Sequence, residues 1–281
     1  MNKTIKILLA VCAAAVFAIA AVSIFGANAE AEKAHTSGLA AADQGAYQKA
    51  IADFTRAIEL DPNLASAYNN RGVAYDDLGD HGKAIADYSQ AIKLDPSYAT
   101  AYNNRGNAYA ALDDYNKAIA DYTQANKLDP NDADAYYNRG VAYYELGDYK
   151  KAINDYMQAI KLNPNNAYAY NNRGYAYYNL GDHDKAIADY NQAIKLDPSY
   201  ANAYNSRGLA YRKLGDHDKA IDDYAQAIKL DPKYATAYNN RGIVYGALGD
   251  LQNATKDARK ACELGNCALL QYMEKNKLLR D

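Results

Sequence analysis

The chain has 281 residues, of which 49% are hydrophobic and 23% charged, a composition typical of folded globular proteins. Its formal net charge of −3, with both signs well represented, argues against a nucleic-acid groove, which needs clustered positive charge. The aromatic residues are 29 Tyr, 3 Phe and no Trp, a bias that indicates that one short unit has been copied many times.

The N-terminus has the features of a secretory signal. Lys3 and Lys6 precede an apolar stretch, residues 7–29, that closes on an Ala-x-Ala motif. This order predicts that residues 1–29 are a signal peptide cleaved after Ala29, so that the body is periplasmic or secreted. The alternative is an uncleaved N-terminal membrane anchor, because the apolar stretch is long enough to span a bilayer.

The rest of the chain repeats with a period of 34 residues. An Arg-Gly pair recurs in phase with every proline of the sequence. The prolines are Pro62, Pro96, Pro130, Pro164, Pro198 and Pro232, and the pairs begin at Arg71, Arg105, Arg139, Arg173, Arg207 and Arg241. A fixed period of this length indicates a repeat protein built from one supersecondary unit.

Each unit is expected to form two helices and a turn. In the second unit, Tyr68, Gly72 and Tyr75 are spaced by four and three residues, which places them on one helix face. Gly79 is expected to end this helix and Asp80 to cap the next. The second helix has its own apolar face, and a proline closes the unit: Ala84, Ile85, Tyr88, Ala91, Ile92 and Pro96. Because neither helix can bury its face alone, stacked units must supply the core.

The pattern of aromatic, Gly, Tyr, Ala, aromatic, Ala and Pro at unit positions 4, 8, 11, 20, 24, 27 and 32 resembles the tetratricopeptide repeat (TPR). One copy reads Tyr68, Gly72, Tyr75, Ala84, Tyr88, Ala91 and Pro96. Seven units span residues 30–268 and start near Ala31, Ala65, Ala99, Ala133, Ala167, Ala201 and Ala235. The resemblance implies an all-α fold, a right-handed superhelical solenoid of antiparallel helix pairs.

The departures from the pattern lie at the ends, where caps are expected. The first unit has Ala34 in place of the aromatic residue and Ser37 in place of the arginine, and the seventh has Ala258 at position 24. Residues 269–281 are predicted to form a capping helix, with Leu269 and Met273 among its apolar residues.

Arginine at position 7 and aspartate at position 23 recur together and predict ion pairs between helices, with a structural role. The aspartates are Asp53, Asp87, Asp121, Asp155, Asp189, Asp223 and Asp257. Three histidines, His81, His183 and His217, share position 17, but equivalent residues of successive units lie about 8–10 Å apart, too far to ligate one metal ion. No catalytic triad, phosphate loop or zinc motif occurs in the sequence, so we expect no enzyme activity and no cofactor.

Cys262 and Cys267 are the only cysteines outside the predicted leader and flank a Gly-Asn turn. In an exported protein such a pair predicts a disulfide that links the last unit to the capping helix, and the alternative is two small buried thiols.

The resemblance implies that a protein or extended peptide binds in the concave groove, lined by first-helix positions 2, 5, 6, 9, 12 and 13. Position 6 is asparagine in five units, interrupted by Ser206: Asn70, Asn104, Asn138, Asn172 and Asn240. Because an amide both donates and accepts hydrogen bonds, this row of asparagines predicts a ladder of hydrogen bonds along the backbone of a bound peptide. The alternative is that asparagine merely fills a polar position on an exposed helix face.

The variable groove positions are expected to set side-chain preference. They place Asp76 and Asp77 in unit two, Arg212 and Lys213 in unit six, and an aromatic cluster in units four and five: Tyr137, Tyr144, Tyr168, Tyr175 and Tyr178. The sequence therefore favours an exported peptide-binding scaffold of undetermined oligomeric state, without nucleic acid, and in contact with a membrane only if the leader is retained. The alternative is an anchored structural spacer, or a self-assembling repeat protein, that binds no peptide tightly.

Overall fold

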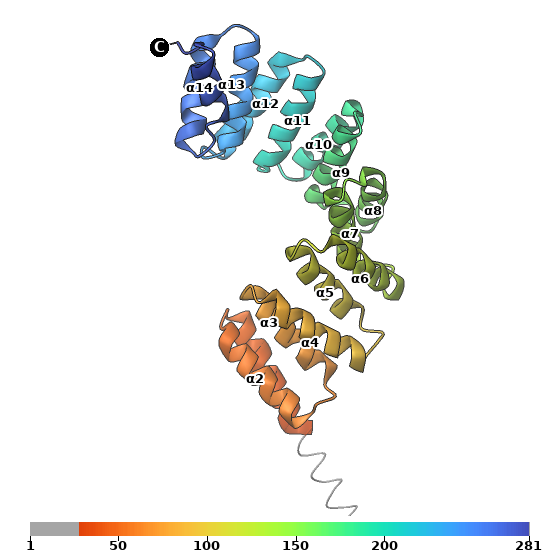
Figure 1. Cartoon of the computed structure of the whole chain (residues 1–281). Helices are drawn as coiled ribbons and strands as arrows, with labels where there is room; N and C mark the ends of the chain where they lie inside the picture. The colour runs from red at the N-terminus through yellow and green to blue at the C-terminus, as the bar shows by residue number, and fades with distance from the viewer. Residues whose placement is uncertain (1–27, 281) are drawn as a thin grey trace, which may run out of the picture. The chain divides into compact units, whose positions relative to one another are not determined.

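The computed structural model describes residues 28–280, which form helices joined by short turns, without a strand in that range (Figure 1). The predicted leader lies outside the described residues, apart from its last two. A first helix covers residues 28–43. The helices that follow are α2 (Tyr47–Leu60), α3 (Ala65–Asp77), α4 (His81–Leu94), α5 (Ala99–Ala111), α6 (Tyr115–Leu128), α7 (Ala133–Glu145), α8 (Tyr149–Leu162), α9 (Ala167–Asn179), α10 (His183–Leu196), α11 (Ala201–Lys213), α12 (His217–Leu230), α13 (Ala235–Ala247), α14 (Leu251–Glu263) and α15 (Ala268–Lys275).

Consecutive helices pack as pairs that recur every 34 residues, which confirms the repeat interpretation and the all-α solenoid class (Figure 1). The described chain divides into two compact units, one ending at Pro130 and one beginning at Asn131. The first holds three helix pairs, and the second holds four pairs and α15. Between residues 28 and 280, no helix combines the length and apolarity needed to cross a bilayer.

The turn between the two helices of a repeat is set by local chemistry. Gly79 has a φ of +78°, a left-handed conformation that ends the first helix at little steric cost. Asp80 then caps the second helix, because its Oδ1 accepts a hydrogen bond from the Lys83 backbone N–H while its Oδ2 pairs with Lys83 Nζ. The same Gly-Asp turn recurs in the later repeats, whereas the third repeat has Asp113 in the left-handed position, with a φ of +59°.

The core of a repeat depends on a close approach between its two helices. Tyr88 is fully buried and packs against Gly72, where an added Cβ would lie 2.7 Å from Tyr88 Cε1. The glycine at position 8 therefore leaves room for the aromatic ring at position 24. The same pairing recurs from Gly38–Phe54 to Gly208–Tyr224.

The first helices of successive repeats lie closer together than the second helices. Within the first unit α3 contacts α5, and within the second unit α7, α9, α11 and α13 contact one another in turn. The second helices of successive repeats make no such contact within either unit's described residues. The first helices therefore line the inner side of the curvature in each unit, as the family resemblance implies for the groove.

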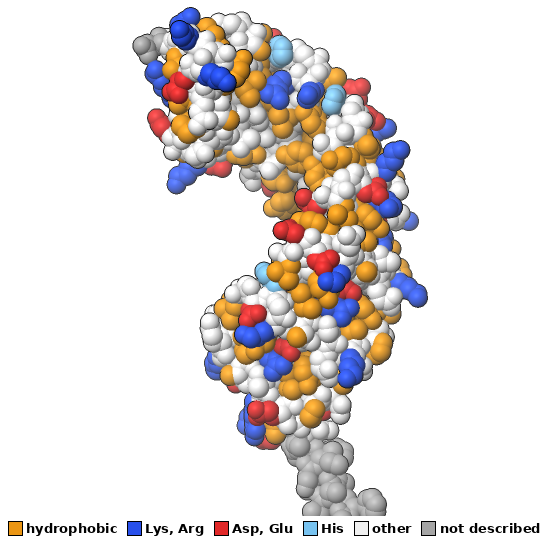
Figure 2. Space-filling model, in the orientation of Figure 1, with side chains coloured by type: hydrophobic (Ala, Val, Ile, Leu, Met, Phe, Trp, Pro, Cys, Tyr) orange, Lys and Arg blue, Asp and Glu red, His pale blue; other side chains and the backbone are white. Residues whose placement is uncertain are grey.

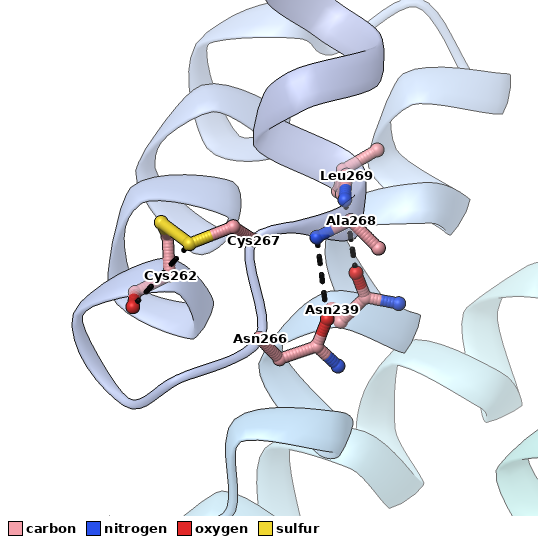
Figure 3. Close-up of a disulfide and its surroundings, with 6 residues drawn as sticks. All are labelled: Asn239, Cys262, Asn266, Cys267, Ala268 and Leu269. Carbon is pink, nitrogen blue, oxygen red and sulfur yellow. Dashed lines mark hydrogen bonds between the residues drawn. A yellow bond between two sulfur atoms is a disulfide. The ribbon is translucent and has the colours of Figure 1, made fainter.

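The short helix α15 closes the C-terminal end of the second unit, as predicted for a capping helix, but it ends at Lys275 and not at the predicted end of the segment 269–281. Its Leu269 fills the space beside Gly242 that an aromatic ring fills in the other repeats, since position 24 is Ala258 here. Asn239 Oδ1 accepts a hydrogen bond from the Leu269 backbone N–H at 3.3 Å (Figure 3). A disulfide between Cys262 and Cys267 joins the last turn of α14 to the residue before α15 (Figure 3).

Candidate peptide-binding face

The repeated arginines belong to the framework of the repeats. Arg71 Nε and Nη2 donate to the two carboxylate oxygens of Asp87 at 2.7 Å, a bidentate pair between the two helices of one repeat. Arg71 Nη1 also donates to Thr55 of the preceding repeat at 3.0 Å, and Arg105 and Arg207 donate in the same way to Ser89 and Asn191, so these arginines tie two repeats together. The ion-pair prediction is confirmed in six repeats: Arg71–Asp87, Arg105–Asp121, Arg139–Asp155, Arg173–Asp189, Arg207–Asp223 and Arg241–Asp257. In the first repeat, Ser37 donates to Asp53 instead.

The asparagines that are expected to contact a peptide instead make hydrogen bonds between successive repeats of this chain. Asn104 Nδ2 donates to Asn69 Oδ1 at 3.1 Å, which joins position 6 of one repeat to position 5 of the repeat before it. Asn240 Nδ2 donates to Asn205 in the same way and is buried, which leaves little of its amide for a ligand. Two further links of this kind are Asn70 with His35 and Asn172 with Tyr137.

We call these hydrogen bonds between position 6 of one repeat and position 5 of the repeat before it the asparagine ladder. The asparagine ladder ends at α15 and is interrupted at Ser206. The position-5 residue of the last repeat, Asn239, accepts from the α15 backbone instead of from a following asparagine. At the interruption, the Oδ1 atom of Asn171 is buried and has no hydrogen-bond partner in the described chain. Tyr175 explains the small residue there, because its hydroxyl reaches across to Asn202 Oδ1 at 3.0 Å and lies against the Ser206 hydroxyl.

The predicted tyrosine cluster lies on first helices α7 and α9 of the second unit. Tyr137 and Tyr144 accept hydrogen bonds at 2.9 Å from the amides of Asn172 and Asn179, each one repeat further on. Burial raises the pKa values of Tyr137, Tyr144 and Tyr175 above the ordinary value of a phenol. The structure brings part of the predicted set together and leaves Tyr168 more exposed, at 57%, against Tyr200.

A pocket of about 200 Å³ opens between α7 and α9 above α8. Three of the predicted residues line it, Tyr144, Tyr175 and Asn172. The predicted set does not include the other lining residues, Val141, Glu145 and Tyr156. Val141 and Glu145 occupy positions 9 and 13, which belong to the groove pattern, and Tyr156 is the buried core tyrosine of this repeat.

None of the predicted charged residues lines this pocket, and the acidic and basic pairs belong to different units. Asp76 is engaged by His81, whose Nδ1 lies 2.6 Å from Asp76 Oδ1, while Asp77 is exposed. Arg212 and Lys213 end α11, where Arg212 is half-buried and Lys213 exposed. On the face drawn in Figure 2, positive and negative side chains are interspersed.

Two larger hollows lie at the C-terminal end. One, of about 510 Å³, is lined mainly by apolar residues of α13 and α15, such as Ile243 and Tyr272. The other, of about 890 Å³, lies along α14, and its charged residues include the ion pairs Arg241–Asp257 and Lys260–Glu263. Neither contains a residue of the predicted binding set.

Curved rows of antiparallel helix pairs with a groove face on their first helices define an α-helical repeat protein of the interaction-scaffold class. The chain belongs to the TPR family: the TPR repeat model matches residues 38–79, 74–113, 106–147, 142–181, 174–215 and 208–249, and the tetratricopeptide repeat model matches residues 235–264. No curated protein shows significant sequence similarity to the chain.

Several solved structures resemble this chain. YrrB, described as a TPR protein with an unusual peptide-binding site, is 29% identical with a TM-score of 0.57, over 66% of this chain and 95% of its own. MamA is 33% identical with a TM-score of 0.55, over 59% of this chain and 96% of its own. A tetratricopeptide repeat protein from Parabacteroides merdae has a TM-score of 0.67 over 89% of this chain and 98% of its own; at 23% identity it shows the fold alone.

Proposed function

We propose that this chain is an exported scaffold that binds an extended peptide segment on the first-helix face of its second unit. The observation that carries the proposal is the pocket between α7 and α9, which is lined by groove positions of two successive repeats. Tyrosine offers a large, stiff contact area and is enriched among residues that dominate binding. The similarity to YrrB, a protein described as having a peptide-binding site, supports the same reading.

The hydrogen-bonding groups of this face suit a peptide backbone. The Tyr144 hydroxyl accepts from Asn179 and can donate its own hydrogen to a carbonyl oxygen of a peptide, whereas the Tyr175 hydroxyl already donates to Asn202 Oδ1 and can accept from a peptide N–H. The asparagine ladder is used internally, so we assign it the role of holding successive first helices in register. Side-chain contacts in the pocket then provide most of the affinity.

The test starts from a random 12-residue peptide library displayed against the purified chain, followed by calorimetry on the selected peptides. Tyr144→Ala is expected to weaken binding at least tenfold, since removing a hot-spot residue typically costs about 2 kcal/mol or more. Met157→Ala is the control, because Met157 is exposed on the second helix α8, away from the pocket. Circular dichroism verifies that both variants remain helical.

Selection of no peptide, or equal binding by Tyr144→Ala and the unaltered chain, would reject the peptide-binding proposal. The anchored or self-assembling spacer would then be the better description.

Export is tested on the protein recovered from its native host. A mature chain that begins at Glu30 supports cleavage after Ala29 and release. A chain that still begins at Met1 would instead support the membrane-anchored alternative.

A further inference from the structure

The pocket between α7 and α9 combines aromatic walls with a single carboxylate. Tyr144, Tyr156 and Tyr175 contribute rings, Val141 contributes an apolar surface, and Glu145 lies at the exposed end of α7. At about 200 Å³ the pocket is smaller than the roughly 300–1,000 Å³ of sites for drug-sized ligands. Its size therefore fits one amino-acid side chain.

The carboxylate of Glu145 has no cationic partner among the described residues. It makes no ion pair or hydrogen bond with a residue in the range 28–280. Its carboxylate lies close enough to the pocket phenols to add to the effect of burial in raising the pKa values of Tyr144 and Tyr156. The pocket thus has a negative group without a cation to pair with it.

The pocket tyrosines also differ from their neighbours on the same helices. Tyr143 and Tyr177 each have a lysine over the ring, with Lys151 Nζ and Lys185 Nζ at 5.2 and 5.4 Å from the ring centroids. Within the described residues, no lysine or arginine lies over the rings of Tyr144, Tyr156 or Tyr175. Tyr156 is fully buried, whereas Tyr144 and Tyr175 are partly exposed, so these two rings are the ones that a cation of a ligand can reach.

We propose that this pocket receives a lysine or arginine side chain of the bound peptide, an inference that rests on the proposed peptide-binding function. The aliphatic stem lies along Val141, and the cation lies over the rings of Tyr144 and Tyr175 next to Glu145. An acidic side chain is repelled by Glu145, and an apolar one removes water from the carboxylate without replacing its hydrogen bonds.

A tyrosine followed by an acidic residue at positions 12 and 13 occurs in one repeat only, so it also determines where along the groove a basic side chain of the peptide binds. Only the fourth repeat has tyrosine at position 12 followed by an acid at position 13; the fifth has Tyr178 followed by Asn179, and the second has Asp76 followed by Asp77. The cationic side chain of the ligand therefore sets the register of the peptide on α7 and α9.

The experiment uses the peptides selected from the 12-residue library against the full mature chain. Each selected lysine is replaced by norleucine and each arginine by citrulline, which keep the shape and remove the charge. At one position, this replacement is expected to weaken binding roughly 3- to 30-fold, the range of a cation–π contact. A photoreactive lysine analogue at that position is expected to cross-link to α7 or α9.

The variant Glu145→Gln separates the charge effect from the fold. It is expected to weaken the lysine peptide several-fold while leaving the norleucine peptide unchanged, and Glu59→Gln on α2 is the matched control that changes neither. Equal effects of Glu145→Gln on both peptides would overturn the cation assignment, and so would selected peptides that contain no basic residue. In either case, weaker binding by Tyr144→Ala would still support the peptide-binding function. A chain that selects no peptide would overturn both.

Discussion

The glycine at position 8 shows how one residue can determine the packing of a helix pair. At Gly140, an added Cβ would lie 2.8 Å from Cε1 of the buried Tyr156, closer than packed atoms tolerate. At Gly246, another glycine within a first helix, the nearest atom is the Ala254 Cβ at 3.8 Å, an ordinary contact. Both positions are helical, so alanine favours the helix at either, and only packing distinguishes them.

Replacing each glycine by alanine therefore has opposite effects. Gly140→Ala is expected to lower the free energy of unfolding by about 1–3 kcal/mol, because overpacking displaces Tyr156. Gly246→Ala is expected to raise it by up to about 1 kcal/mol, because alanine has the better helix propensity. Urea unfolding followed by circular dichroism measures both, and a Gly140→Ala chain as stable as Gly246→Ala would contradict the close approach.

The asparagines mark the limit of sequence reasoning at this scale. Their spacing shows that they recur on one helix face, and this predicts a row of groups that contact a ligand. Whether an amide faces solvent or the next repeat depends on the distance between first helices, which is a tertiary property. The hydrogen bond between Asn104 and Asn69 joins two repeats, so it cannot be predicted from the sequence of either repeat alone.

At the scale of helices, the second helix of five repeats begins at an aspartate that both caps it and pairs with a lysine. The pKa of the Asp182 carboxyl is lowered by two hydrogen bonds from Lys185. The bond from the lysine side chain has the larger effect, and the bond from the backbone N–H has the smaller one. The other four are Asp80, Asp114, Asp148 and Asp216, and the pKa of each is lowered first by the side-chain hydrogen bond from the lysine three residues further on.

These caps predict a stability that falls in acid. A carboxyl with a lower pKa in the folded state stabilises the fold above its unfolded pKa of about 4, and loses this contribution as the pH falls through the folded value. Replacing all five aspartates by asparagine keeps the caps and removes the titration. The decrease in urea midpoint from pH 6 to pH 3 is expected to be smaller in this variant than in the unaltered chain, and an equal decrease would exclude the caps as its source.

The helix α15 acts as the neighbour that the seventh repeat lacks. Leu269 is 9% exposed and packs with Ala254, Ala258 and Met273. Leu269→Ala is expected to destabilise the chain by about 2–4 kcal/mol, because it leaves a cavity beside Gly242. Tyr272→Ala on the same helix is the control, since Tyr272 is 59% exposed and its loss should change stability by less than about 0.5 kcal/mol.

At the scale of the whole molecule, each repeat is stabilised mainly by its neighbours, so the ends are expected to open first. The first repeat is the weaker end, because Ser37 makes a single hydrogen bond to Asp53 where later repeats have a bidentate arginine. The C-terminal end retains the Arg241–Asp257 pair and is covered by α15.

Hydrogen exchange followed by mass spectrometry should resolve this gradient. We expect amides in residues 28–60 to exchange before those of α9 and α10, because local opening is easiest where one neighbour is missing. In Leu269→Ala, faster exchange should spread to α13 and α14 and leave the first repeat unchanged. Uniform protection along the chain would show that it unfolds as one cooperative body instead.

The sequence by itself determined the period, the helix pairs, the Gly-Asp turns and the Arg–Asp pairs, because each depends on spacing within one 34-residue unit. It also predicted a C-terminal cap, since Ala258 departs from a pattern that its neighbours keep. The tertiary structure decided which groove residues meet. Val141, Glu145 and Tyr175 come from two repeats and form one pocket only because first helices lie in contact, and Ser206 is small because Tyr175 occupies the adjoining space.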